Sequence, residues 1–130
     1  MINLFKKLKE MKIMLIDDDE WIRDSLSLFF ESEGCHITAL ETAEEGMKEL
    51  KNLSYDIIIV DYKLPGMSGP EFLKLVKTSH PHARTILITA YGRKDIFLAA
   101  RKIEVNDFID KPFTAKNIEE SLIRLMDVCE

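Results

Sequence analysis

The segment Asp56-Ile57-Ile58-Ile59-Val60-Asp61 places four consecutive apolar residues between two aspartates. A strand that is apolar at every position is buried on both faces, which is typical of the centre of a parallel sheet. Parallel strands are joined by crossover connections, which are usually helices. This segment therefore predicts an α/β protein in which residues 57–60 form a central strand and Asp61 lies at its carboxyl end.

On both sides of this segment, short apolar runs alternate with segments of helical period, as in β/α units around a parallel sheet. The expected strands are 11–16, 35–40, 57–60, 85–89 and 107–109. The expected helices follow them around 22–29, 43–50, 70–76, 95–103 and 118–125. Five such pairs predict a single doubly wound (βα)5 flavodoxin-like domain with a parallel five-stranded sheet of order 2-1-3-4-5. Residues 1–10 are expected to form a solvated N-terminal lead-in, and residues 11–130 the domain.

Composition excludes several classes of protein. The chain has 130 residues, of which 46% are hydrophobic and 32% charged, as in one globular domain with its own core. A net charge of −5 argues against direct electrostatic binding of nucleic acid. The longest apolar run, 96–100, is far too short to span a membrane. Cys35 and Cys129 form neither a disulfide framework nor a metal motif, which favours a cytoplasmic location.

Polar residues follow four of the expected strands. Asp17 and Asp18 end the first strand, Asp61 the third, Thr89 the fourth and Lys111 the fifth. Ligands of open α/β sheets bind outside the carboxyl ends of the strands, where the strand order reverses. With the order 2-1-3-4-5, the three aspartates are expected in one crevice, flanked by the threonine and the lysine.

These residue types together suit a phosphoryl group. Three converging carboxylates repel one another unless a cation lies among them, and Mg²⁺ prefers such oxygen ligands. An aspartate beside a metal ion can act as a nucleophile toward phosphorus. Lys111 supplies a compact positive charge and Thr89 a hydroxyl donor, both suited to the oxygens of a transferred phosphoryl group.

With these residues in place, the sequence resembles a receiver domain of two-component response regulators, of the phosphorelay type, over roughly residues 12–129. The matching segments are Ile16-Asp17-Asp18-Asp19, 56–69 around Asp61, Ile88-Thr89-Ala90 and 108–112. Each motif alone is weak, but together, in this order and spacing, they are highly specific.

The resemblance implies a role for each acidic residue. Asp61 is expected to be the phospho-acceptor, receiving its phosphoryl group from a sensor histidine kinase or a histidine phosphotransfer protein. Asp17, Asp18 and Asp61 are expected to hold Mg²⁺, with the backbone carbonyl of Lys63 as a further ligand. Such a domain catalyses its own phosphorylation and dephosphorylation, so it is a stoichiometric switch and not a turnover enzyme.

The resemblance also implies how the domain switches. Thr89 and Lys111 are expected to bind the phosphoryl oxygens, and Thr89 and the aromatic Phe108 to move together. The bond between Lys111 and Pro112 is usually cis in the family. A downstream protein is expected on the face formed by 95–103, 107–109 and the last helix, where Leu98 points away from the buried stripe. The domain is then a monomer or a phosphorylation-dependent dimer.

Two details depart from, or refine, the family pattern. Glu104-Val105-Asn106 stands where the family often has a Gly-Ala turn before the last strand. Lys63 and Tyr91 resemble the variable residues of sporulation-type phosphorelay intermediates, which implies a long-lived acyl phosphate.

Other functions remain open from sequence alone. A small phosphohydrolase with an aspartate nucleophile also needs Mg²⁺, Asp, Thr and Lys, and Asp17-Asp18-Asp19 nominally fits its motif. Those enzymes, however, require additional length for a cap or further strands. A docking-only pseudo-receiver is disfavoured because all acidic, hydroxyl and lysine positions are filled. The chain is either a stand-alone receiver or a piece of a longer regulator.

Overall fold

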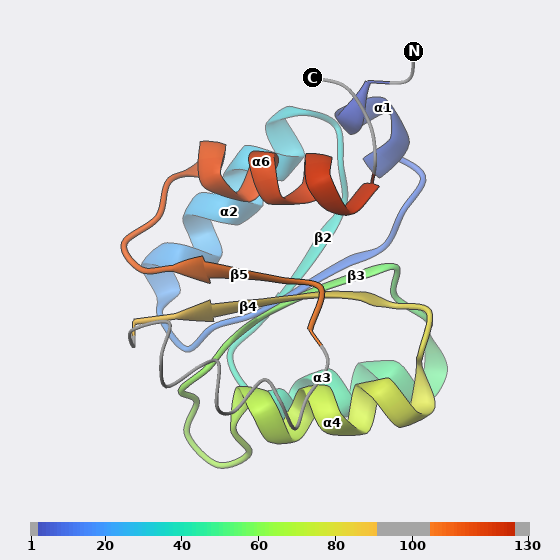
Figure 1. The fold of residues 1–130 in the computed structure, drawn as a ribbon, viewed down its shortest axis with the longest axis vertical. Helices are drawn as coiled ribbons and strands as arrows, with labels where there is room; N and C mark the ends of the chain where they lie inside the picture. Colours follow the sequence, from blue (N-terminus) through green and yellow to red (C-terminus); the bar gives the residue numbers. More distant parts are fainter. Residues whose placement is uncertain (1–2, 91–104, 127–130) are drawn as a thin grey trace.

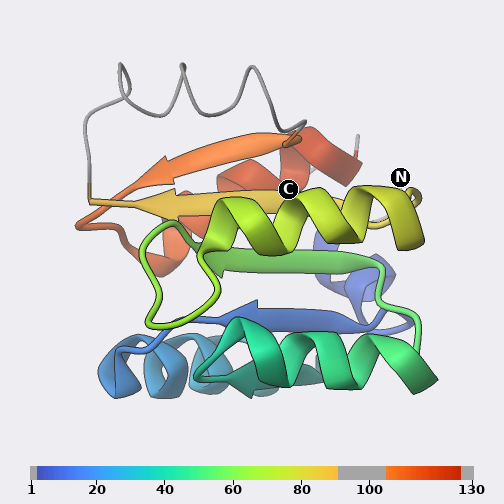
Figure 2. The same cartoon turned by 90° about the horizontal axis from the view of Figure 1, so that it is seen from below.

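Five parallel strands form one sheet in the order β2-β1-β3-β4-β5. The structure is a computed structural model and describes residues 3–90 and 105–126. The strands are β1 (Ile13–Ile16), β2 (Ile37–Leu40), β3 (Ile57–Asp61), β4 (Arg84–Thr89) and β5 (Asp107–Asp110). Helices α2 (Glu20–Ser32) and α6 (Ala115–Met126) cover one face of the sheet, and α3 (Ala43–Asn52) and α4 (Gly69–Ser79) the other (Figures 1 and 2). The predicted fold class and strand order are confirmed.

Part of the sequence-based account falls on residues that the structure does not describe. The expected helix 95–103, with Leu98, and the variable residue Tyr91 lie outside the described residues. The expected partner face can therefore be described only through β5 and α6.

The central strand is buried on both sides, as its composition requires. All five residues of β3 are buried, and neighbouring side chains of a strand point to opposite faces. Ile57 and Ile59 pack in the cluster under α2 and α6, whereas Ile58 and Val60 pack in the cluster under α3 and α4. One strand thus contributes to two hydrophobic cores.

Two strands begin later than the sequence pattern indicates, because the preceding residues belong to helix ends. Met11 N donates to the carbonyl of Leu8, so the chain is still turning after a short helix. Cys35 N donates to the carbonyl of Phe30 at the end of α2, so β2 begins only at Ile37. A capping box starts α3: the Thr42 side chain accepts a hydrogen bond from Glu45 N, and the Glu45 side chain accepts one from Thr42 N.

The solvated lead-in expected for residues 1–10 is wrong for residues 4–8. These residues form helix α1 (Leu4–Leu8), whose two leucines are 1% and 0% exposed. The leucines are four positions apart, so they share one face of the helix and enter the core under α2 and α6. Lys7 Nζ donates to the carbonyl of Met126 at the end of α6, 3.3 Å away. The packed part of the chain therefore includes this helix, which lies beside the end of α6 (Figure 1).

We expect Leu8→Ala to lower the free energy of unfolding by about 2–4 kcal/mol, because it removes a fully buried side chain and leaves a cavity. Urea unfolding followed by circular dichroism measures this loss. Leu75→Ala, at a position 44% exposed, is the matched control and should change the free energy by less than about 1 kcal/mol. Equal losses in the two variants would contradict the buried position of α1.

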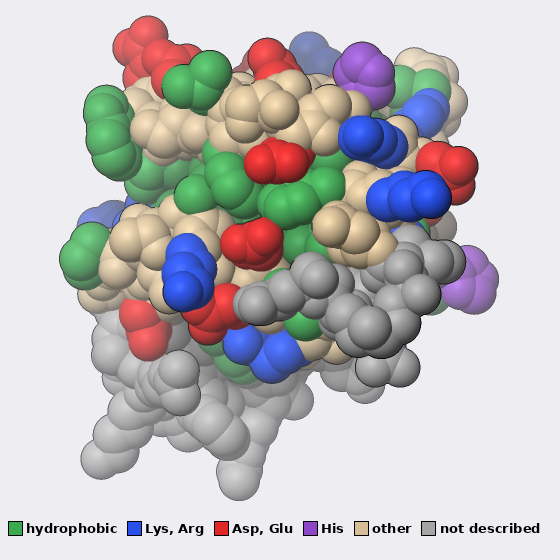
Figure 3. Space-filling model, turned by 90° about the horizontal axis from the view of Figure 1, so that it is seen from above, with side chains coloured by type: hydrophobic (Ala, Val, Ile, Leu, Met, Phe, Trp, Pro, Cys, Tyr) green, Lys and Arg blue, Asp and Glu red, His purple; other side chains and the backbone are tan. Residues whose placement is uncertain are grey.

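The side of the molecule that carries α1 and α6 has a mixed surface. Apolar, acidic and basic side chains lie interspersed on it (Figure 3). On α2, Trp21 and Leu28 are 74% and 71% exposed.

No helix within the described residues is both long and apolar enough to cross a bilayer.

Candidate functional site

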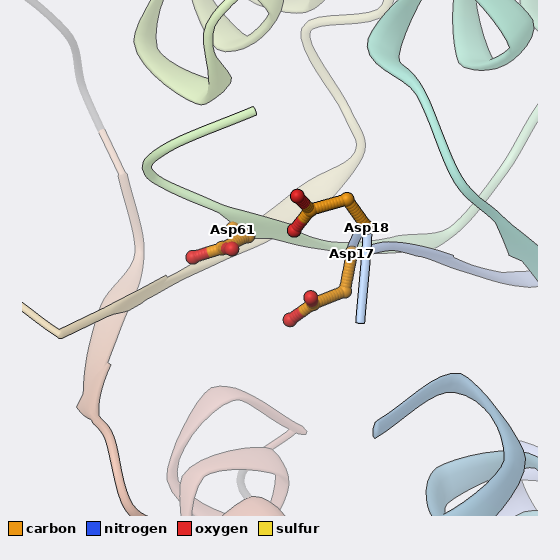
Figure 4. Close-up of side chains that lie close together, drawn as sticks. All are labelled: Asp17, Asp18 and Asp61. Carbon is orange, nitrogen blue, oxygen red and sulfur yellow. The ribbon is translucent and has the colours of Figure 1, made fainter. Parts of the chain in front are cut away.

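Three aspartates meet where β1 and β3 end. Asp17 directly follows β1, Asp18 follows it in turn, and Asp61 is the last residue of β3. One carboxylate oxygen from each lies within 4.8 Å of the others, and the three groups surround one space (Figure 4). The convergence expected from the strand order is present.

Lys111 supplies one positive charge to this cluster. Its Nζ lies 3.1 Å from Asp61 Oδ2, to which it donates a hydrogen bond, and 3.3 Å from Asp17 Oδ2. Asp17 is fully buried and Asp61 is 5% exposed, so water screens neither charge well. Asp17 Oδ2 has this ionic contact but no hydrogen-bond partner among the described residues. Within residues 3–90 and 105–126, Lys111 is thus the ammonium group that pairs with two of the three carboxylates, Asp17 and Asp61.

The pKa values of the site follow first from burial and then from the neighbouring charges. Burial, followed by the charge of Asp17, raises the pKa of Asp61 to about 6, and Lys111 only partly opposes the shift. Burial also raises the pKa of Asp17. For Lys111, burial alone would lower the pKa, but the charges of Asp17 and Asp61 outweigh it and leave the pKa raised. The lysine therefore stays protonated, while the carboxylates repel one another.

The donor set fits a magnesium ion. Mg²⁺ is a hard cation that takes oxygen ligands, commonly one or two carboxylates together with waters and phosphate oxygens. The Asp17 oxygen without a hydrogen-bond partner is an atom that such an ion would satisfy. A cavity of about 430 Å³ opens beside the aspartates and is lined by Asp18, Asp61, Lys63, Leu64, Pro65, Ala90 and Lys111. It offers room for a phosphoryl group next to Asp61.

We expect Asp61→Asn to stabilise the metal-free protein at pH 7.5 by about 2–3 kcal/mol, since one pKa unit corresponds to about 1.4 kcal/mol. The folded-state pKa of Asp61, about 6, lies above the ordinary value of 3.8. Folding therefore favours the protonated carboxyl, and stability is lost as pH rises from about 4 through 6. The advantage of the variant should vanish near pH 4 in unfolding experiments with a chelator. Asp24→Asn, at an exposed position, is the control and should change the free energy of unfolding by less than about 0.5 kcal/mol.

The loop after Asp61 is held in a tight path by a glycine. Gly69 N donates to the carbonyl of Tyr62, 3.1 Å away, which closes the loop that contains Lys63. A Cβ atom at position 69 would overlap the carbonyl oxygen of Asp61. At the other side of the loop, Met67 N donates to Glu44 Oε2 on α3, 3.0 Å away. Neither Gly69 nor Glu44 was predicted from the sequence as part of the site, because their contacts depend on the path of the loop.

We expect Gly69→Ala to destabilise the fold by at least about 2 kcal/mol, because the backbone of Asp61 or of α4 must move to admit the methyl group. Thermal unfolding measures this effect. Ser79→Ala at the exposed end of the same helix is the control. A wild-type melting temperature for Gly69→Ala would show that the backbone approach is looser than described.

The remaining candidates lie on β4 and β5. Thr89, the last residue of β4, is fully buried, and its carbonyl accepts from Lys111 N at 2.7 Å. Phe108 is half-buried on β5 and packs against the cluster under α3 and α4. The peptide bond between Lys111 and Pro112 is cis. All of the site residues named from sequence are thus described, and the acidic cluster, Thr89 and Lys111 lie at the same edge of the sheet.

A doubly wound sheet with an acidic cluster and a lysine at its carboxyl edge suits a class of domains that handle phosphoryl groups. The sequence model of the response regulator receiver domain family matches residues 13–123. The chain belongs to this family. The resemblance drawn from its motifs is confirmed.

Similar proteins have different overall lengths. Response regulator protein FleR of Pseudomonas aeruginosa is 32% identical over 113 residues, which are 87% of this chain and 24% of FleR. Chemotaxis protein CheY-3 of Vibrio cholerae is 29% identical over 124 residues, 92% of this chain and 94% of CheY-3. A CheY-like receiver domain structure from Methanospirillum hungatei superposes with a TM-score of 0.83 at 27% identity, covering 90% of this chain and 94% of the other. The chain spans about a quarter of FleR and about half of the FixJ proteins that it matches.

Receiver domains as a family have a known general role. Receiver domains of two-component systems accept a phosphoryl group and are not turnover enzymes in the usual sense. They bind Mg²⁺ at an acidic cluster of the kind that Asp17, Asp18 and Asp61 form here. They exchange signals with kinases or phosphotransfer proteins and with downstream effectors.

Proposed function

We propose that Asp61 is the phospho-acceptor of a two-component phosphorelay and receives its phosphoryl group from a histidine kinase or a histidine phosphotransfer protein. An oxygen of the Asp61 carboxylate forms a bond to phosphorus, and the bond between phosphorus and the donor imidazole breaks. The imidazole nitrogen keeps the electron pair and takes up a proton. The observation that carries this assignment is the nearly buried Asp61 carboxylate, hydrogen-bonded to Lys111 and open to a cavity.

The other site residues prepare Asp61 for this step. Asp17, Asp18 and Asp61, together with the backbone carbonyl of Lys63, would hold Mg²⁺. The bound ion supplies positive charge that offsets the charge of the phosphoryl oxygens. Lys111, whose pKa is raised by its two aspartate partners, remains an ammonium group that binds a phosphoryl oxygen. The hydroxyl of Thr89, at the same edge of the sheet, donates a hydrogen bond to another phosphoryl oxygen.

Phosphorylation then alters the surface that partners recognise. The Thr89 side chain moves toward the phosphoryl group, and the Phe108 ring turns into the space that the threonine vacates. The domain thereby shifts from one conformer to another. The downstream protein binds the face that includes β5 and α6, and the domain is a monomer or dimerises upon phosphorylation. Lys63 and Tyr91 suit an intermediate with a long-lived acyl phosphate. The domain acts in the cytoplasm, without membrane or nucleic-acid contact of its own.

Labelling stoichiometry tests this function. The protein is incubated with Mg²⁺ and either acetyl phosphate or a phosphomonoester, and its intact mass and the phosphate released are followed over time. A single phosphoryl group per chain, absent when Mg²⁺ is chelated, supports the proposal. Many turnovers per chain on a phosphomonoester, without stoichiometric labelling, would favour an aspartate-dependent phosphohydrolase instead.

A further inference from the structure

An arginine outside the acidic cluster contacts the backbone that carries it. Arg23 lies at the end of the first turn of α2, and its Nη1 donates to the carbonyl oxygen of Asp17 over 2.9 Å. Its own backbone N–H donates to the carbonyl of Asp19, which caps the helix. The side chain, which is half-buried, therefore reaches back from the helix to the end of β1.

The carbonyl that Arg23 binds belongs to the peptide unit between Asp17 and Asp18. Because a peptide unit is planar, fixing its oxygen fixes the rotation of the whole plane. The plane joins the α-carbons of both aspartates, so the hydrogen bond restrains ψ of Asp17 and φ of Asp18, the two angles that set the path of the backbone carrying both side chains.

Other polar atoms of Asp17 have contacts of their own, although its Oδ2 accepts no hydrogen bond from the described residues. Its backbone N–H donates to the carbonyl of Leu40 at 3.1 Å, and its Oδ1 accepts from Asp19 N at 2.9 Å. Its Oδ2 lies 3.3 Å from Lys111 Nζ. Asp18, in contrast, is exposed. The hydrogen bond from Arg23 is therefore a restraint on the backbone that carries the exposed Asp18 carboxylate.

We infer that Arg23 is a positioning residue, which orients Asp17 and Asp18 for a divalent cation and so sets the affinity of the site for Mg²⁺. The inference rests on the proposed function, in which these two aspartates hold the ion. A role through charge alone has the opposite sign, because a guanidinium group near the site repels a cation and its removal should tighten binding. The direction of the change in affinity therefore separates the two roles.

Calorimetric titration of Mg²⁺ into the whole chain tests the inference. For Arg23→Met we expect Mg²⁺ to bind about 10-fold more weakly. Removing a group that orients metal ligands typically lowers metal affinity by about 10–100-fold, and this expectation is at the lower end of that range. Arg23→Lys, which keeps a charged donor, should recover part of the affinity. Arg84→Met is the matched control because it removes an arginine at the start of β4, the opposite edge of the sheet, and should bind Mg²⁺ like the wild type.

Phosphorylation by acetyl phosphate gives a second readout. With Mg²⁺ far above its dissociation constant, Arg23→Met should be phosphorylated at close to the wild-type rate, whereas at low Mg²⁺ it should be slower. Unchanged or tighter Mg²⁺ binding by Arg23→Met would overturn the inference, including the case in which only the melting temperature falls. If Arg23→Met does not fold, Arg23→Gln takes its place with the same expectation.

The role of Arg23 and the proposed function of the domain can be contradicted separately. If the wild type binds Mg²⁺ and is phosphorylated, but Arg23→Met binds Mg²⁺ equally well, only the role of Arg23 is wrong. If the wild type itself neither binds Mg²⁺ nor takes up a phosphoryl group from acetyl phosphate or a phosphorylated kinase, the proposed function fails and the inference falls with it.

Discussion

Asp61→Asn is expected to abolish phosphorylation completely, with no detectable mass gain after incubation with Mg²⁺ and acetyl phosphate. An asparagine amide keeps the shape of the side chain but is a far poorer nucleophile toward phosphorus than a carboxylate. Because the substitution also relieves repulsion with Asp17, the variant should remain folded, so loss of labelling would reflect chemistry and not unfolding.

Asp56→Asn is the matched control for this experiment. Asp56 directly precedes β3, at the opposite end of the strand from Asp61, and its carboxylate accepts a hydrogen bond from Lys12 N. This variant should still gain one phosphoryl group. Wild-type labelling of Asp61→Asn would show that another residue accepts the phosphoryl group.

Asp17→Asn is expected to weaken Mg²⁺ binding by at least about 100-fold, because it removes a charged oxygen from the site. Loss of a group that merely orients a metal ligand typically costs 10–100-fold, and loss of a ligand should cost no less. Asp17 is fully buried, so water cannot take the place of its carboxylate without rearrangement. Calorimetry measures the dissociation constant, and the fluorescence of Trp21, at the start of α2, gives an independent titration.

Metal removal provides a thermodynamic check on the same residue. A ligand that binds only the folded state stabilises it in proportion to the logarithm of its concentration over its dissociation constant. Mg²⁺ should therefore raise the melting temperature of the wild type and leave that of Asp17→Asn nearly unchanged. Asp24→Asn, on the exposed side of α2, should respond like the wild type. An equal response of wild type and Asp17→Asn to Mg²⁺ would place the ion elsewhere.

The sequence was sufficient to predict the sheet and the convergence of the acidic residues. The uninterrupted apolar residues of β3 indicate its central position, because a strand covered on both faces is apolar at nearly every position. Once the strand order is given, the positions of Asp17, Asp61 and Lys111 at strand ends follow from topology. Their chemical roles remain predictions that the experiments above test.

The features that the sequence did not predict depend on contacts between distant segments. Helix α1 is too short to be stable by itself, and its leucines are buried only because α2 and α6 provide a surface for them. The close approach of Gly69 to Asp61 depends on the path of the intervening loop. The hydrogen bond from Arg23 depends on a side-chain conformation, which residue spacing does not specify.

Locating the phosphoryl group within the chain tests the central claim most directly. Acyl phosphates are reduced by borohydride, which converts a phosphorylated aspartate to homoserine, and peptide mass spectrometry then identifies the residue. After treatment with acetyl phosphate and Mg²⁺, we predict homoserine at position 61 and unmodified aspartate at positions 17, 18 and 56. Reduction at any of those other positions, with Asp61 unmodified in a labelled protein, would contradict the account.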